Sequence, residues 1–124
     1  MTENEISSKL IGAAVEVHRQ VGPGLTADFY EECLVHELEA AGLKVDRQVL
    51  IPTHYKGRRI EPGYRIGLLL EDCVIVEVTA GSADRSRLSR ILACLKLAEL
   101  KLGILIDFNH PKLMDGFRRV VNRL

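Results

Sequence analysis

A single carboxylate, Glu77, interrupts an apolar, strand-like stretch that runs from residue 73 to residue 79. Buried carboxylates are rare unless they are paired, hydrogen-bonded or bound to a metal, so Glu77 is the first candidate for chemistry. It is either a metal ligand or one half of an ion pair, and Arg65 and Arg90 are the cations available to it. A divalent ion needs several hard oxygen ligands, so the sequence favours the ion pair.

Arginine residues gather at the start of a predicted helix and near the C-terminal end of the chain. Because guanidinium groups bind phosphate, both groups are candidates for a phosphate-binding face. The formal net charge of zero favours a solvated surface instead, so nucleic acid is a disfavoured partner. The candidate phosphate-binding residues are Arg85, Arg87, Arg90, Arg118 and Arg119, with Arg123 nearby.

Cysteine and histidine residues offer little for metal chemistry. Cys33 and His36 lie three residues apart on one predicted helix face, but no second pair has ligand spacing, so we expect no zinc site. The three cysteines form no CxxC pair and lie in apolar stretches. We therefore expect reduced core residues in a cytoplasmic protein.

Helical periodicity predicts three helices that position these residues. The first spans residues 4–21, with Asn4 or Ser7 as its cap, and ends at a Gly-Pro-Gly breaker. The second spans residues 26–41, with Thr26 or Asp28 as its cap. The third spans residues 83–101 and is apolar on two sides, so it is either sandwiched in the fold or buried in a subunit contact through Leu97 and Leu100.

Alternating patterns predict the strands. Residues 45–51 form a half-exposed edge strand before Pro52, followed by a short polar hairpin or loop around Gly57. Two buried strands, residues 64–70 and 73–79, form an antiparallel hairpin around Glu71-Asp72. A further buried strand, residues 103–108, should lie parallel to the second of these, and a short element follows in the tail. Alternation places Glu77 and Thr79 on one sheet face.

The bulk composition is that of one globular domain spanning residues 1–124. Apolar residues make up 47% and charged residues 27% of the 124 residues, and no apolar run approaches the roughly 20 residues of a membrane span. The first ten residues also lack the basic-then-apolar order of a signal peptide. We therefore expect an α/β protein with a mixed sheet, helices on it and no membrane partner.

Several sequence words resemble those of the GxxExxxY proteins, a small prokaryotic family of the PD-(D/E)XK nuclease-like superfamily. The resemblance implies the superfamily core, αβββαβ, with an extra N-terminal helix. The matching words cover nearly the whole chain in order: IGAAVEVHRQVGPGL, FYEECLVHELEAAGLKV, RQV, YKG, GYRIGLLLEDCVIVEV, LKLAELKLGILIDFN and MDGFRRVVN.

The resemblance also implies a catalytic site that this chain has largely lost. Intact relatives are expected to hold a divalent metal between carboxylates and to use a lysine that helps a bound water attack a phosphodiester. Glu77 keeps the strand glutamate, and Gly24 and Tyr30 keep the glycine and tyrosine of the helix motif. The other positions are substituted: Ala27 for the helix glutamate, Gly67 for the aspartate, Thr79 for the lysine, Arg90 for a glutamine and Cys94 for a tyrosine.

The substitutions predict a catalytically inactive nuclease-like domain with a structural or self-assembling role. We expect a homo-oligomer without a cofactor, with Leu97 and Leu100 in the interface. The alternative is a weak nuclease dependent on Mg²⁺ or Mn²⁺, or a nucleic-acid binder, that uses Glu77 and the arginines. A second oxygen ligand near Glu77 would distinguish the two, because only a nuclease needs one.

Overall fold

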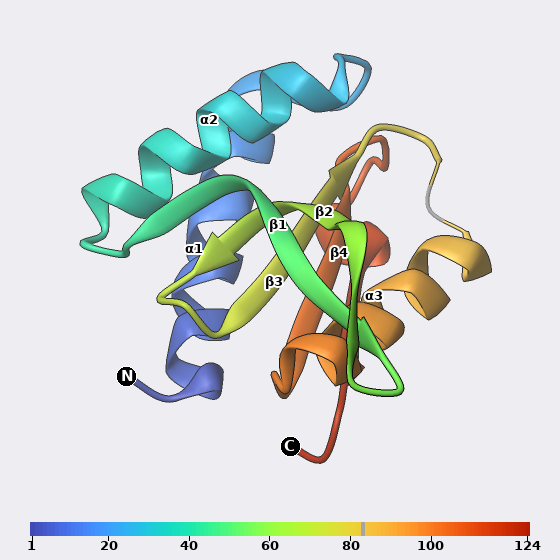
Figure 1. Cartoon of the computed structure of the whole chain (residues 1–124). Helices are drawn as coiled ribbons and strands as arrows, with labels where there is room; N and C mark the ends of the chain where they lie inside the picture. The colour runs from blue at the N-terminus through green and yellow to red at the C-terminus, as the bar shows by residue number, and fades with distance from the viewer. Residues whose placement is uncertain (83) are drawn as a thin grey trace.

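A mixed five-stranded sheet in the order β1-β2-β3-β4-β5 forms the centre of the computed structural model, which describes residues 1–82 and 84–124. Strands β3 and β4 run parallel, and every other neighbouring pair is antiparallel. Helices α1 and α2 cover one face of the sheet and α3 covers the other (Figure 1). The predicted α/β class with a mixed sheet flanked by helices is confirmed.

The elements follow one another along the chain as the sequence predicts, with one 3-10 helix added. Their bounds are α1 Glu3–Val21, α2 Ala27–Ala40, β1 Val45–Tyr55, β2 Arg58–Leu70, β3 Val74–Thr79, α3 Arg85–Ala98, β4 Leu102–Asp107, the 3-10 helix η1 Leu113–Gly116 and β5 Phe117–Val121.

Side-chain caps fix the starts of the helices. Thr2, rather than Asn4 or Ser7, caps α1 and forms a reciprocal capping box with Glu5. Thr26 accepts a hydrogen bond from the Phe29 amide and caps α2, as predicted. The predicted start of the third helix, Ala83, lies outside the described residues.

Helix α3 is shorter than predicted because it ends at Ala98 rather than at residue 101. Glu99 adopts the left-handed conformation with φ 57°, and the Leu100 amide donates to the Leu95 carbonyl, which closes the helix. Leu100 therefore follows the helix and packs, half-buried, against the cluster under α3.

The strands differ from prediction mainly in length. The polar segment around Gly57 is the tip of one long hairpin, in which β1 and β2 pair as far as Tyr55 and Arg58. The Glu71-Asp72 turn is confirmed, and both residues have positive φ. The tail element is a strand, β5, which pairs with β4.

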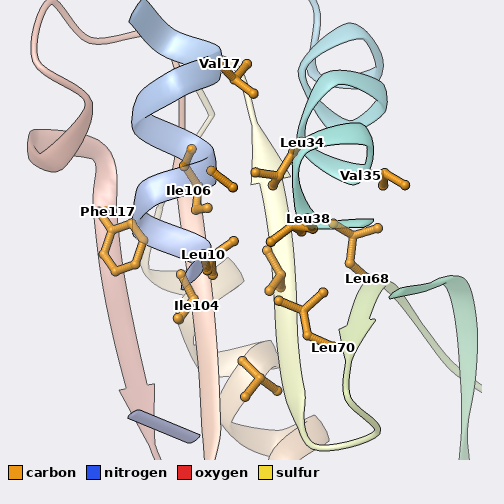
Figure 2. Close-up of a cluster of buried hydrophobic side chains, with 14 of the residues drawn as sticks. Leu10, Val17, Leu34, Val35, Leu38, Leu68, Leu70, Ile104, Ile106 and Phe117 are labelled. Carbon is orange, nitrogen blue, oxygen red and sulfur yellow. The ribbon is translucent and has the colours of Figure 1, made fainter. Parts of the chain in front are cut away.

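The larger apolar cluster lies between the sheet and helices α1 and α2. Leu10 of α1 lies beside Ile104 and Ile106 of β4, whereas Leu38 of α2 lies beside Leu68 of β2 (Figure 2). Along β3, Val74, Val76 and Val78 belong to this cluster, whereas Ile75 belongs to the smaller cluster under α3. The predicted alternation of β3 is thus confirmed, although Cys73 lies in the turn and packs with the larger cluster.

Helix α3 contacts the sheet through one face only. Ile91, Cys94 and Leu95 are buried against the sheet, whereas Ala93 and Leu97 are exposed. Of the two alternatives that the sequence leaves open for this helix, burial of both sides within the fold is therefore not observed.

Candidate functional site

Strands β2 and β3 separate at Gly67 and Glu77, and we call this point the fork. The two strands pair only between Leu68–Leu70 and Val74–Val76, less than the hairpin predicted from the sequence. Beyond these pairs the Gly67 amide donates to Glu77 Oε1 at 3.0 Å. A side-chain carboxylate thus occupies the place of a backbone acceptor, and the sheet opens there.

A second carboxylate reaches the fork from α2. The Cβ of a larger residue at position 67 would lie 3.3 Å from Glu77 Oε2 and 3.7 Å from Glu31 Oε2. The Glu31 side chain is only 13% exposed. Two carboxylates, one from a helix and one from a strand, therefore border the space that the absent side chain of residue 67 would fill.

The sequence reasoning missed Glu31, although a signal for it was present. Ala27 occupies the position of the family's helix glutamate, and Glu31 follows four residues later on the same helix face. The adjacent Asp28 instead points about 100° away from Ala27 around the helix axis. The i, i+4 spacing from Ala27 is thus the sequence signal that points to Glu31.

The carboxylates of the fork are protonated more easily than isolated ones. Burial raises the pKa of Glu77. The hydrogen bond from the Gly67 amide and the positive charges of Arg90 and Arg87 lower this pKa, but by less. Burial likewise raises the pKa of Glu31, with Arg47 as the main opposing charge. The Arg47 guanidinium lies 3.7 Å from Glu31, but it bonds more closely to Glu32.

The predicted ion pair at Glu77 is not observed. Among residues 1–82 and 84–124, no salt bridge joins Glu77 to an arginine, and the main partner of Glu77 is the backbone amide of Gly67. Arg65 lies opposite Leu50 in the β1–β2 pairing rather than beside Glu77. Arg90 acts on Glu77 only through its charge.

Thr79 occupies the position at which the family resemblance implies a lysine. Its side chain is 1% exposed, and its hydroxyl finds no hydrogen-bond partner among the described residues. Cys94, at the implied tyrosine position, is also buried; burial raises the pKa of its thiol, and the charge of Glu77 raises it further. Both groups are neutral and shielded from water, so neither can activate a water molecule.

Tyr30, the tyrosine of the helix motif, has a structural role. It is fully buried and stacks on Phe108, with ring centroids 4.5 Å apart. Its hydroxyl donates to the Gly22 carbonyl at 2.6 Å and accepts from the Leu25 amide at 3.0 Å. Tyr30 therefore holds the Gly22–Leu25 loop between α1 and α2 against the core.

The predicted phosphate-binding arginines do not form one face. Arg85 and Arg118 line a cavity of about 350 Å³ that also contains Asp84, Asp107 and Asp115. Arg119 instead donates to Asn4 Oδ1 of α1, on the opposite side of the sheet. The charges of Arg87 and Arg90 lower the pKa of Glu77 at the fork. The five arginines are therefore divided among three places on the molecule.

The Cys33 and His36 pair lies in a shallow cavity of about 320 Å³ between α1 and α2. In the part of the chain that the structure describes, no three His, Cys, Asp or Glu side chains are grouped closely enough to hold a metal ion. The fork supplies two carboxylates, from Glu31 and Glu77, and Mg²⁺ in proteins is usually held by one or two carboxylates together with waters or phosphate oxygens. At the position where the resemblance implies a lysine, the chain has the neutral hydroxyl of Thr79.

The mixed sheet, with a carboxylate fork between two of its strands, defines a nuclease-like α/β domain. A family model described as the PD-(D/E)XK nuclease superfamily matches residues 4–120, and the chain belongs to this superfamily. Membership of the narrower GxxExxxY family stays a prediction. No curated protein and no solved structure matches the chain. Among the described residues, no helix is both long and apolar enough to cross a membrane.

Proposed function

We propose that this chain is a catalytically inactive nuclease-like domain that acts in the cytoplasm as a structural, self-assembling protein. The observation that carries the inactivity is the burial of Thr79, at 1% exposure, on the strand that also carries Glu77. A phosphodiester hydrolase needs an activated water and a cation to stabilise developing charge. A buried neutral hydroxyl supplies neither.

The residue at position 67 supports the same proposal. Glycine leaves the fork without the carboxylate that would bridge Glu31 and Glu77 around a metal. The direct test is a cleavage assay on plasmid and single-stranded DNA with Mg²⁺ or Mn²⁺. We expect no cleavage above that of the Glu77→Ala variant, and metal-dependent cleavage that this variant loses would refute the proposal.

Exposed apolar surface supports self-assembly. Leu97 on α3 is 39% exposed, and three large side chains of the β1–β2 hairpin, Tyr55, Ile60 and Tyr64, are more exposed still. β1 also forms an open edge of the sheet, and open edges pair readily with other strands. Because Leu100 packs against the cluster under α3, Leu97 is the better interface candidate of the two predicted leucines.

The mass in solution tests self-assembly, by light scattering after size exclusion. We expect a discrete oligomer of the 13.9 kDa chain, shifted toward monomer by Leu97→Glu. The matched control is Met114→Glu, an equally drastic change at an exposed apolar residue of η1. A monomeric wild-type protein, or an oligomer that both variants dissociate equally, would contradict an interface at Leu97.

Glu31 favours one second candidate, a weak metal-dependent nuclease or nucleic-acid-binding domain. It is the second oxygen ligand near Glu77 that such a site requires. Isothermal titration with Mn²⁺ tests it, with Glu31→Gln and Glu77→Gln as variants that keep side-chain size. Saturable binding that both variants abolish would favour this candidate, whereas no binding at millimolar Mn²⁺ would exclude it.

A further inference from the structure

A basic depression lies at the end of the sheet where α3 ends and β4 begins. It has a volume of about 640 Å³ and is lined by Lys96, Glu99, Lys101, Asn122 and Arg123. We call these five residues the basic depression. In Figure 1 the end of α3 and the C-terminal segment lie together in the lower part of the molecule. No apolar residue lines the depression, so a charged or strongly polar ligand is the kind that fits it.

The charge of the basic depression is positive although the chain as a whole is neutral. Three cations, Lys96, Lys101 and Arg123, accompany one carboxylate, Glu99. None of the three cations takes part in a salt bridge within residues 1–82 and 84–124. Unpaired like charges brought together repel one another, and a bound anion relieves this repulsion.

The backbone around the basic depression is fixed by hydrogen bonds. The Asn122 side chain donates to the Leu100 carbonyl at 2.9 Å, and its backbone amide donates to the Lys101 carbonyl at 2.8 Å. These two bonds join the segment after β5 to the α3–β4 loop, so Lys101 and Arg123 are held as neighbours. A site whose backbone is ordered in advance loses less entropy on binding.

Two residues of the depression adopt an unfavourable backbone conformation. Glu99 and Arg123 have φ values of 57° and 60°, in the left-handed region that usually favours glycine or asparagine. At Glu99 the helix end explains the conformation but not the choice of a charged residue over glycine. Strained backbone persists where the structure holds it in place and is common at binding sites.

We infer that the basic depression binds a phosphate-bearing ligand at a site separate from the fork. Lysine and arginine recognise phosphate oxygens, and a volume of 640 Å³ accommodates a ligand as large as a nucleotide. Leu102, which follows Lys101, pairs with Val74 of β3. Val74 lies three residues before Glu77 on the same strand. At 3.3 Å per residue, the basic depression therefore begins more than about 10 Å from Glu77 along the strand. The inference does not depend on the proposed inactivity of the fork.

The phosphate can come from free nucleotides or from a nucleic-acid backbone, and two arms of one experiment distinguish these sources. Amide resonances of the ¹⁵N-labelled full chain are followed during titration with pyrophosphate and, separately, with a ten-residue oligothymidylate. In both arms we expect saturable shifts of the Lys101, Asn122 and Arg123 amides. Tighter binding of pyrophosphate assigns the site to free phosphates. Tighter binding of the oligonucleotide, falling steeply with salt, assigns it to a backbone.

Charge variants test whether pyrophosphate binds in the basic depression itself. Lys101→Gln and Arg123→Gln should each weaken pyrophosphate binding about tenfold, whereas Glu99→Gln should strengthen it several-fold because it removes the one repelling charge. The matched control is Lys112→Gln, an exposed lysine outside the depression. Equal weakening by Lys112→Gln, no effect of Glu99→Gln, or shifts confined to other amides would each overturn the inference.

Discussion

Glu31 of α2 and Glu77 of β3 approach the same point in space, the place that the Cβ of a larger residue at position 67 would occupy. The two glutamates are separated by 46 residues in the sequence yet belong to one site, because β2 and β3 part at Gly67 and admit both. Of the three carboxylate positions that the resemblance implies, only Glu77 remains, since the other two hold Ala27 and Gly67, and Glu31 adds a second carboxylate from outside that set. The fork has therefore lost some of the implied carboxylates but still holds two.

A carboxylate restored at position 67 should create a metal site. Gly67→Asp places its Cβ 3.3 Å from both Glu77 Oε2 and the Val76 carbonyl, which is tight but requires shifts of only tenths of an ångström. Three neighbouring carboxylates repel without a cation, so we expect a loss of about 1–3 kcal/mol in the free energy of unfolding. Millimolar Mn²⁺ should recover it and bind at least tenfold more tightly than to wild type. Gly67→Asn, of equal size, should gain no affinity in calorimetry; if it does, charge is not the cause.

The pH dependence of stability should reveal the burial of Glu77. Its pKa in the folded state is raised above the ordinary value of 4.5, so the folded protein holds this proton more tightly than the unfolded chain. Stability from this group is therefore full below about pH 4.5 and is lost as pH rises through the folded pKa. Glu77→Gln keeps an acceptor for the Gly67 amide but cannot ionise. In urea unfolding we expect it to be more stable than wild type at pH 7.5, with the difference shrinking toward pH 4. A less stable variant at pH 7.5 would mean that the Gly67 amide and the charges of Arg90 and Arg87 together outweigh burial.

Removal of the Thr79 hydroxyl should stabilise the protein. This hydroxyl is buried without a partner among the described residues, and valine has nearly the same shape without the polar group. We expect Thr79→Val to raise the free energy of unfolding by about 1–2 kcal/mol. Thr53→Val is the matched control, because the Thr53 hydroxyl donates to the Ile60 carbonyl at 2.8 Å, and its loss should cost about 1 kcal/mol. Destabilisation by Thr79→Val in denaturant titrations would show that the hydroxyl has a partner after all.

The Tyr30 hydroxyl should matter for stability. Tyr30→Phe keeps the stacking on Phe108 but leaves the Gly22 carbonyl and the Leu25 amide without their shared partner. We expect a loss of about 1–3 kcal/mol, measured by thermal unfolding in circular dichroism. Tyr64→Phe, at an exposed tyrosine, should change stability by less than about 0.5 kcal/mol. Equal effects of the two substitutions would argue against a structural role of the Tyr30 hydroxyl.

Local patterns sufficed for the order of elements and the faces of β3, because residue period and turn residues act over short stretches. The Glu71-Asp72 turn and the Thr26 cap are such cases. The ends of elements were less predictable: Glu99 closes α3 with a backbone conformation that is rare for glutamate. The fork was predicted only from its strand side. Glu31 reaches it by the packing of α2 against the sheet, a long-range relation that the i, i+4 spacing from Ala27 merely suggests.

The opening of the sheet at Gly67 has a consequence for how the molecule unfolds locally. β2 is joined to β3 through three residue pairs, whereas β1 and β2 pair along nearly their whole lengths. The outer hairpin, from Leu50 to Arg65, is therefore held to the rest of the protein chiefly by Ile51 under α3. Amide hydrogens of this hairpin can exchange with solvent through local unfolding. Those of β3 and β4 exchange only when the whole domain unfolds.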